Sequence, residues 1–334
     1  MKKTIQIALI TMSLSGSALA QDVHFSFAEL SPLSINPALA GANADKEIIL
    51  NYRNQWSRVG TPYATQNAAF HGRLSNTKKR QDNWICGGIQ LTSDKAGAPG
   101  INNNGVSLSL ADQIKVGRNS RVGLGLQVGF AQRAIRPADG RWGSQYDGNA
   151  YNAGLQSGEE NGNISKNYAD VGVGAVYSYT KRKGVVTGSV DRLFNVGFAA
   201  YHVNRPDYGF VTTENARLPI RFTFFANGEF AIRDGAAALM PGAYVFRQGT
   251  FSEYLVGLYY KYKVINPSKY TGYVKPLSVS FGAFARANDA AILKLLVDYH
   301  RYSIGYSFDA NTSKLSTYIR SRGAHEIVLR FVIY

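Results

Sequence analysis

The sequence has a single cysteine, Cys86, among its 334 residues, and it has no long apolar run. One cysteine excludes a disulfide framework and a CxxC metal site. No segment after the N-terminus approaches the roughly 18 consecutive apolar residues of a transmembrane helix. If the chain spans a membrane, it must therefore do so as a closed sheet, because only helices and closed barrels satisfy every backbone polar group in lipid.

Recognisable catalytic motifs are also lacking. The five histidines, His24, His71, His202, His300 and His325, are dispersed, with no i,i+4 pair and no HExxH. No GxSxG elbow, phosphate-binding loop or paired acidic motif stands out. We therefore expect neither enzyme activity nor a metal or other cofactor, although a catalytic site assembled across strands would leave no such motif.

The first twenty residues have the three parts of a secretory signal peptide. Lys2 and Lys3 form a positive n-region, residues 5–14 form a short apolar stretch, and residues 18–20 form a small-x-small cleavage site. The apolar stretch is too short to cross a bilayer as a helix. No cysteine follows the cleavage site, which excludes a lipoprotein anchor. We predict that residues 1–20 are a cleaved signal peptide.

The composition of the whole sequence suits an outer-membrane barrel. Glycine (34), tyrosine (21) and phenylalanine (17) are abundant, whereas charged residues make up only 18%. Barrels need small residues in the lumen and aromatic residues at the membrane interfaces. In a soluble protein, the net charge of +15 would suggest binding to nucleic acid. In a protein exported by a signal peptide, anionic lipid headgroups or an acidic partner protein explain the charge better, and we expect no binding to nucleic acid.

Period-two alternation is the clearest signal in the sequence. Apolar residues recur at every second position in five runs, at 106–110, 122–130, 194–200, 277–285 and 327–333. In a lipid-spanning strand, alternate side chains face hydrocarbon and lumen. We predict an all-β fold over 46–334, a transmembrane antiparallel barrel of about 14 strands, an even number as in other single-chain barrels. The predicted strands are 46–56, 63–74, 84–93, 105–116, 121–134, 167–180, 192–202, 217–232, 237–247, 252–264, 276–287, 291–299, 301–309 and 324–334.

The lengths of the connections predict the orientation. With both termini in the periplasm, the turn at 117–120 and the join at 300–301 are periplasmic. The longest connection, 136–166, lies outside, as long loops do in outer-membrane barrels. Two basic clusters also fall on the periplasmic side: Lys78, Lys79 and Arg80, and Lys181, Arg182 and Lys183. They are either solvated turns or contacts with a periplasmic partner or anionic cell-wall polymer.

The segment at 21–45 breaks the alternation and contains two prolines. It either stays in the periplasm or folds into the lumen. We favour a plug in the lumen, since about eight strands is the number whose own side chains fill a barrel and about fourteen leave it wider.

Several motifs carry a resemblance to a known family. They are Asp22-Val23-His24-Phe25-Ser26, Ser31-Pro32-Leu33, Asn36-Pro37-Ala38-Leu39-Ala40-Gly41 and Asn51-Tyr52-Arg53-Asn54-Gln55-Trp56. Together with the stretches at 60–71, 93–97 and 322–324, these motifs resemble the PorP/SprF family of the type IX secretion system. The resemblance runs through the whole mature chain. Val23 and Phe27-Ala28 depart from the family's usual proline and Gln-aromatic pair, which leaves the subgroup open.

The resemblance implies an outer-membrane protein of Bacteroidetes-type bacteria that supports secretion, retention or anchoring of a cell-surface protein, such as a large adhesin, with a link to gliding motility. It implies three kinds of partner: outer-membrane lipid, a secreted type IX substrate or adhesin, and periplasmic lipoprotein or ring components. Some family members have a core role in the secretion machinery, and others are dedicated partners of one secreted surface protein. The sequence leaves both roles open for this chain.

A transporter of hydrophobic small molecules is the alternative. The fatty-acid-channel family also has about fourteen strands and an N-terminal hatch with an Asn-Pro-Ala motif. The Tyr-Arg-Asn-Gln-Trp motif of residues 52–56 favours a role in anchoring a surface protein over transport. The predicted plug argues against a general diffusion porin.

Eight residues are candidates for contacts between plug and lumen: Asp22, His24, Phe25, Asn36, Pro37, Gly41, Arg53 and Gln55. Asn36 before a proline favours a turn, and Gly41 permits a sharp bend. Alternation places Arg53 in the lumen. There it either binds the Asp22 carboxylate or plug carbonyls, or only solvates the lumen. Trp56 is predicted in the aromatic girdle.

Overall fold

The computed structural model describes residues 22–42, 44–56, 61–74, 83–97, 100–158, 162–183, 189–210, 216–232, 235–266, 274–312 and 322–333. The predicted signal peptide and the basic cluster Lys78, Lys79 and Arg80 lie outside these residues. No helix in the described part of the chain is long and apolar enough to cross a membrane.

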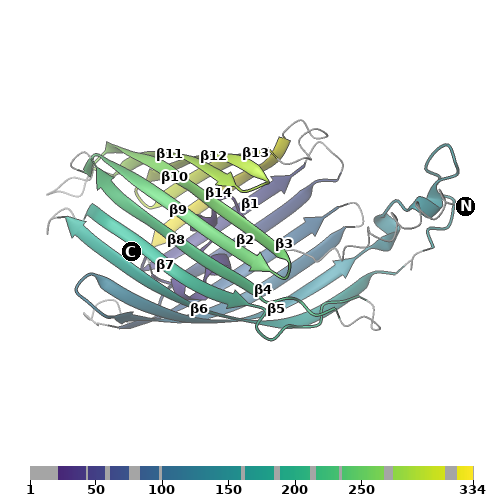
Figure 1. The fold of residues 1–334 in the computed structure, drawn as a ribbon, viewed down its shortest axis with the longest axis horizontal. Coiled ribbons are helices and arrows are strands. Elements are labelled where there is room, and N and C mark those ends of the chain that lie inside the picture. Colours follow the sequence, from purple (N-terminus) through teal and green to yellow (C-terminus); the bar gives the residue numbers. More distant parts are fainter. Residues whose placement is uncertain are drawn as a thin grey trace, which may run out of the picture.

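Fourteen antiparallel strands close into a single barrel, in which each strand pairs with its sequence neighbours and β1 pairs with β14 (Figure 1). The strands are β1 (Lys46–Gln55), β2 (Tyr63–Arg73), β3 (Trp84–Ala96), β4 (Ile101–Lys115), β5 (Ser120–Ile135), β6 (Ile164–Lys183), β7 (Ser189–Tyr201), β8 (Arg221–Ile232), β9 (Ala237–Gln248), β10 (Phe251–Ile265), β11 (Leu277–Arg286), β12 (Ala290–Tyr299), β13 (Tyr302–Asn311) and β14 (Arg322–Ile333). Each predicted strand is present, and the predicted fold class is confirmed.

The alternation predicted in β5 separates its two faces. Leu124, Leu126 and Val128 are 47–52% exposed on the outer surface, whereas Gln127 between them is 6% exposed. Leu126 pairs across the sheet with Leu110 and with Val173, which are also exposed. Cross-strand neighbours on one face share an environment, so these residues form a continuous apolar outer band.

The largest differences from the predicted strands are at β4 and β6. β4 begins at Ile101 and β6 spans Ile164–Lys183, several residues beyond the predicted limits. The added residues are mainly polar, such as Asn102 and Asn104, so hydrophobic alternation could not reveal them. These residues still pair with the neighbouring strands, because β4, β5 and β6 all extend further at the end that carries the connection at 136–163 (Figure 1, right).

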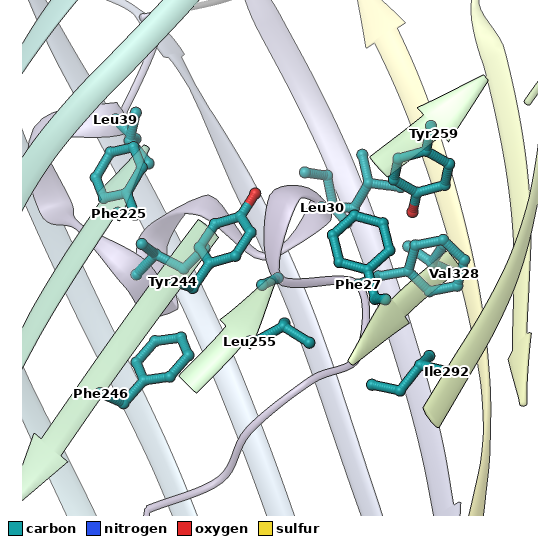
Figure 2. Close-up of a cluster of buried hydrophobic side chains, with 14 of the residues drawn as sticks. Phe27, Leu30, Leu39, Phe225, Tyr244, Phe246, Leu255, Tyr259, Ile292 and Val328 are labelled. Carbon is teal, nitrogen blue, oxygen red and sulfur yellow. The ribbon is translucent and has the colours of Figure 1, made fainter. Parts of the chain in front are cut away.

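Residues 22–42, which we name the inner segment, lie inside the barrel. They contain η1 (Ala28–Leu30), α2 (Pro32–Ile35) and η2 (Pro37–Leu39). Pro32 and Pro37 each stand at the first helical position, where a missing N–H costs no hydrogen bond. Apolar side chains of the segment meet inward-facing side chains of the wall in one buried cluster (Figure 2). The labelled members are Phe27, Leu30, Leu39, Phe225, Tyr244, Phe246, Leu255, Tyr259, Ile292 and Val328.

The inner segment runs from one end of the barrel to the other. Asp22 contacts residues that border the connection at 202–220, at the end we call the long-loop end. Ile333 pairs with Lys46 at the opposite end, which we call the C-terminal end. Asp22 and Ile333 therefore lie at opposite ends of the barrel, and the prediction that both termini are periplasmic stays a prediction, because the residues before Asp22 lie outside the described part of the chain. The chain crosses the lumen before β1 starts, which strand alternation could not reveal.

Leu126→Arg tests the outer band. An arginine in the hydrocarbon region destabilises a barrel by about 2–4 kcal/mol near the midplane and about 0–1 kcal/mol near the interfaces. We expect Leu126→Arg to lower the unfolding free energy in lipid vesicles by the larger amount. Asn104→Arg, exposed on the same face near the long-loop end, is the matched control and should stay near wild type. Equal losses for both variants would contradict the assignment of this face to lipid.

Candidate functional site: the inner segment and its anchors

Arg53 is the centre of a buried ionic network. It points inward from β1 and is 1% exposed. Its guanidinium lies 2.8 Å from the Asp309 carboxylate of β13 and 3.4 Å from the Glu326 carboxylate of β14. It also donates to the Ser26 hydroxyl of the inner segment. One side chain therefore joins three strands of the wall to the segment.

The two carboxylates beside Arg53 bind the inner segment directly. Glu326 accepts the backbone N–H of Ser26 at 2.6 Å and that of Phe27 at 3.2 Å. The Ser26 hydroxyl lies 2.8 Å from both oxygens of Asp309. Hydrogen bonds to ionised groups are roughly twice as strong as neutral ones. The start of η1 is thus fixed against the wall by charged acceptors.

Arg286 of β11 extends the network to β10. Its guanidinium lies 3.2 Å from Asp309 and 3.2 Å from Glu253, and it donates to the Ser26 hydroxyl at 3.1 Å. Glu253 lies 3.4 Å from Nδ1 of His24. Removing one partner from a buried ion pair leaves an uncompensated charge. The two guanidiniums and three carboxylates therefore hold one another in place.

Glu29 makes a second anchor. Both of its oxygens lie 3.2 Å from the Lys294 ammonium of β12, and one accepts the Tyr259 hydroxyl of β10. The Lys294 nitrogen also lies 3.6 Å from the centroid of the Phe284 ring, within cation–π range. A buried lysine is thereby compensated by one carboxylate and by an aromatic face.

The Asn-Pro-Ala motif binds the opposite wall. The Asn36 amide donates to the carbonyls of Ala175 in β6 and Phe198 in β7, both at 2.9 Å, and its oxygen accepts the Ala38 N–H. A Cβ atom at Gly174 would lie 2.0 Å from the Asn36 side-chain oxygen. Only glycine lets the strand backbone approach so closely.

The bend at Gly41 closes the segment near β1. Gly41 has a φ of 60°, which favours glycine, and a Cβ there would lie 2.6 Å from Sγ of the buried Cys86. Its N–H donates to Nδ1 of His71 at 3.3 Å. The predicted sharp bend is present, and its tight packing adds a second reason for glycine.

Asp22 is held at the long-loop end. His202, directly after β7, lies between two carboxylates, 2.6 Å from Asp22 and 2.8 Å from Asp170. Arg221 lies 3.5 Å from Asp22, and the Gln248 side chain bonds both its N–H and its carboxylate. Burial alone would raise the pKa of Asp22, but His202 and Arg221 outweigh it and hold that pKa below its usual range. Burial would lower the pKa of His202, but Asp22 and Asp170 raise it to about 10.

The structure corrects one predicted pairing. Arg53 does not bind Asp22, because the inner segment extends away from β1 before Ser26 and brings Asp22 to β7, β8 and β9. The partner of Arg53 in the segment is Ser26. Arg53 is therefore bound to the segment and is not a merely solvated lumen residue.

The other candidates are placed less centrally. Phe25 is buried and Pro37 starts η2, whereas Gln55 is half-buried at the end of β1 without a side-chain hydrogen bond among the described residues. The Trp56 ring makes an edge contact with Tyr63, with centroids 4.9 Å apart, and its place in the girdle stays a prediction. Lys181 is exposed near the end of β6, and Arg182 and Lys183 complete that strand.

Sequence reasoning missed most of the wall partners. They are Glu253, Arg286, Lys294, Asp309, Glu326, His202 and Arg221. The available signal was a charged residue at an inward-facing position of an apolar strand, as with Arg286 and Glu326. Such positions need a charged partner when they are buried. The described residues contain no group of three His, Cys, Asp or Glu side chains that could hold a metal ion.

Comparisons with known proteins extend the description. The family model described as "Type IX secretion system membrane protein PorP/SprF" matches residues 17–331. No curated protein matches the chain in sequence. Among solved structures, the chain is similar to CdiB from Acinetobacter baumannii, with 7% identity and a TM-score of 0.40 over 86% of this chain and 60% of that one. It is also similar to BamA from Haemophilus ducreyi lacking POTRA domains 1-3, with 8% identity and a TM-score of 0.41 over 87% and 70%. For LpxR from Salmonella typhimurium the values are 11% and 0.36 over 86% and 100%.

Arg53→Met tests the ionic network. It leaves Asp309 and Glu326 buried without their shared guanidinium, a change that costs about 3–5 kcal/mol for a buried ion pair. We expect the variant to reach the membrane and to unfold at lower temperature or denaturant concentration, measured by heat-modifiable gel mobility. Arg247→Ala removes an exposed arginine at the same end and should leave the unfolding transition unchanged. Wild-type stability for Arg53→Met would contradict the proposed network.

His202→Asn tests the cluster at Asp22. The folded pKa of His202 is raised from 6.5 to about 10. Its contribution to stability is therefore fully present below pH 6.5 and is lost as the pH rises towards 10. We expect the wild-type melting temperature to fall more steeply across that window than the variant's. Asparagine tolerates the positive φ of 57° at this position. Parallel pH profiles would show that His202 is not protonated in the fold.

Proposed function

Because the chain belongs to the PorP/SprF family of type IX secretion system membrane proteins, we propose that it is a non-enzymatic outer-membrane barrel that supports secretion, retention or anchoring of one cell-surface protein. The observation that carries the proposal is the filled lumen. The inner segment binds β1, β13 and β14 through Ser26, β10 and β12 through Glu29, and β6 and β7 through Asn36. A segment fixed to opposite walls acts as a plug.

The strength of these anchors argues for a role at the surface of the barrel. A transporter of hydrophobic molecules would have to move the plug during each passage. Movement would separate Glu29 from Lys294 and Ser26 from Glu326, which leaves buried charged groups unsatisfied. A partner that docks on the loops requires no such change.

The long-loop end offers a surface for a protein partner. In the connection after β5, Tyr146 and Tyr151 are 57% and 40% exposed, and Leu155 is 38% exposed. The loop has internal order: the Trp142 indole donates to the Pro137 carbonyl at 2.9 Å. Tyrosine and other aromatic residues are enriched at protein interfaces. This ordered aromatic loop is our candidate for contact with the secreted partner.

The C-terminal end carries a surface for periplasmic components. Basic residues near that end include Lys46, Arg73, Lys115, Arg118, Arg121, Lys181, Arg192 and Lys275. A concentration of one charge sign attracts surfaces of the opposite sign. We assign this end to the periplasm and the long-loop end to the cell exterior, which places acidic periplasmic parts of the secretion system within reach.

An inserted epitope tests that orientation. A tag at Gly148, in the long connection, should be labelled by antibody on intact cells. A tag at Arg118, in the turn between β4 and β5, should be labelled only after the outer membrane is permeabilised. The reverse pattern would invert the barrel and contradict the assignment of both surfaces.

Deletion of the gene tests the function. We expect one large protein to disappear from the cell surface, measured by mass spectrometry of proteins shaved from intact cells. Uptake of hydrophobic nutrients and resistance to detergent should stay normal, because the plugged barrel is not a transport path. Re-expression of the wild-type chain should restore the surface protein. An unchanged surface proteome with slowed uptake of a hydrophobic nutrient would contradict the proposal and favour the transporter.

A further inference from the structure

The lumen is not filled equally along its length. A cavity of about 140 Å³ lies at the long-loop end, between the inner segment and the walls of β3 to β8. The inward-facing side chains of Thr92, Asn103 and Ser107 are half-exposed there, whereas Ser109 and Gln113, deeper in β4, are buried. Solvent therefore reaches the inner face of the wall at this end and not below it.

Small inward-facing residues create the hollow. Gly105 and Ser107 of β4 and Gly129 and Ala131 of β5 line it side by side. A Cβ placed at Gly105 would lie 3.0 Å from the Thr92 hydroxyl, and the next atoms, in Ala131 and Phe130, are 3.8 Å away. The inner segment closes the floor with Leu33 and Ser34, and the Ser34 hydroxyl accepts a hydrogen bond from Gln90 at 2.5 Å.

The walls of the cavity carry neutral hydrogen-bonding groups. Gln90, Thr92, Asn103 and Gln127 supply amides and a hydroxyl, and Tyr168 adds a phenol. The charged groups at the rim are already paired with one another, since Asp22 and Asp170 both bind His202. This lining suits an uncharged polar chain better than an ion or a lipid tail.

One side of the cavity is formed by the stretch of chain before Ser26. Asp22, Val23 and Phe25 line it, and residues 22–25 form no helix or strand. Within the described ranges, the N–H and C=O groups of Val23, His24 and Phe25 make no hydrogen bond, although Ser26 and Phe27 directly after them do. Val23 and His24 are half-buried, so their main-chain groups are open to a ligand that enters the cavity. Main-chain N–H and C=O groups without a partner in the fold can pair with an added strand.

We propose that this cavity binds an extended peptide segment of the secreted partner, which pairs its main chain with residues 23–25 and places small, uncharged side chains against Gly105 and Gly129. The inference rests on the proposed function and identifies where the partner is held. Main-chain pairing supplies the affinity, and the glycine-lined wall selects small side chains. The inner segment then acts as a receptor strand as well as a plug.

Site-specific photocrosslinking in native cells tests the proposal. A photoreactive phenylalanine analogue replaces Asn103, which lines the cavity, or Asn104, which is exposed on the outer face of the same strand. We expect the surface protein that is lost on gene deletion to crosslink at position 103 and not at 104, through one short segment mapped by mass spectrometry. Crosslinks at a loop position such as Tyr146, with none at 103, would contradict the assignment of the cavity as the binding site and leave the proposed function intact. A glycan adduct at 103 would contradict the assignment of the ligand as a peptide. If deletion removes no surface protein, both proposals fail.

A filled cavity and a modified peptide sharpen the test. Ala131→Trp should reduce crosslinking at 103 at least tenfold, whereas Ala134→Trp, outward on the same strand by its alternation, should not. Heat-modifiable gel mobility checks that both variants are folded. The mapped segment, synthesised with alternate backbone N-methyl groups, should bind the purified barrel at least tenfold more weakly than the unmodified peptide. Equal binding of the two peptides would exclude main-chain pairing.

Discussion

The structure depends on the pairing of Arg53 with Asp309 and Glu326. These three side chains come from β1, β13 and β14, so they join the first strand of the barrel to the last two. The same groups bind the start of the inner segment through Ser26 and Phe27. Because buried charges need their partners, closure of the barrel and placement of the segment stabilise one another. Strand pairing closes the barrel by itself, and the segment adds to its stability.

This coupling explains the path of the inner segment. Charged acceptors fix it at Ser26, an amide fixes it at Asn36, and a glycine bend ends it at Gly41. Between these points short helices bury apolar side chains against the wall (Figure 2). Above Ser26, the side chains of Asp22 and His24 still have ionic partners in the wall, and Asp22, Val23 and Phe25 line the cavity. The segment thus presents the unpaired main-chain groups of residues 23–25 at the long-loop end.

Much of this fold could be predicted from the sequence, because lipid imposes a simple rule on each strand. Alternation located all fourteen strands and placed Arg53 inside, and the break in alternation at 21–45 marked the inner segment. The partners of Arg53 could not be predicted, since Asp309 is 256 positions away and only strand register brings it near. The path of Asp22 to His202 was missed for the same reason. Alternation shows whether a side chain points into the lumen or outward, but it does not show which other side chain it contacts.

The central claim is that the inner segment closes the lumen as part of the folded barrel. Ion conductance across planar lipid bilayers tests it most directly, with the full mature chain compared with a variant that lacks residues 24–42. Strand pairing closes the variant's barrel without the segment, so we expect steady conductance through its open lumen. The full chain should insert without steady conductance. Equal, steady conductance of the two proteins would contradict the account, since it would mean that the segment leaves the lumen open.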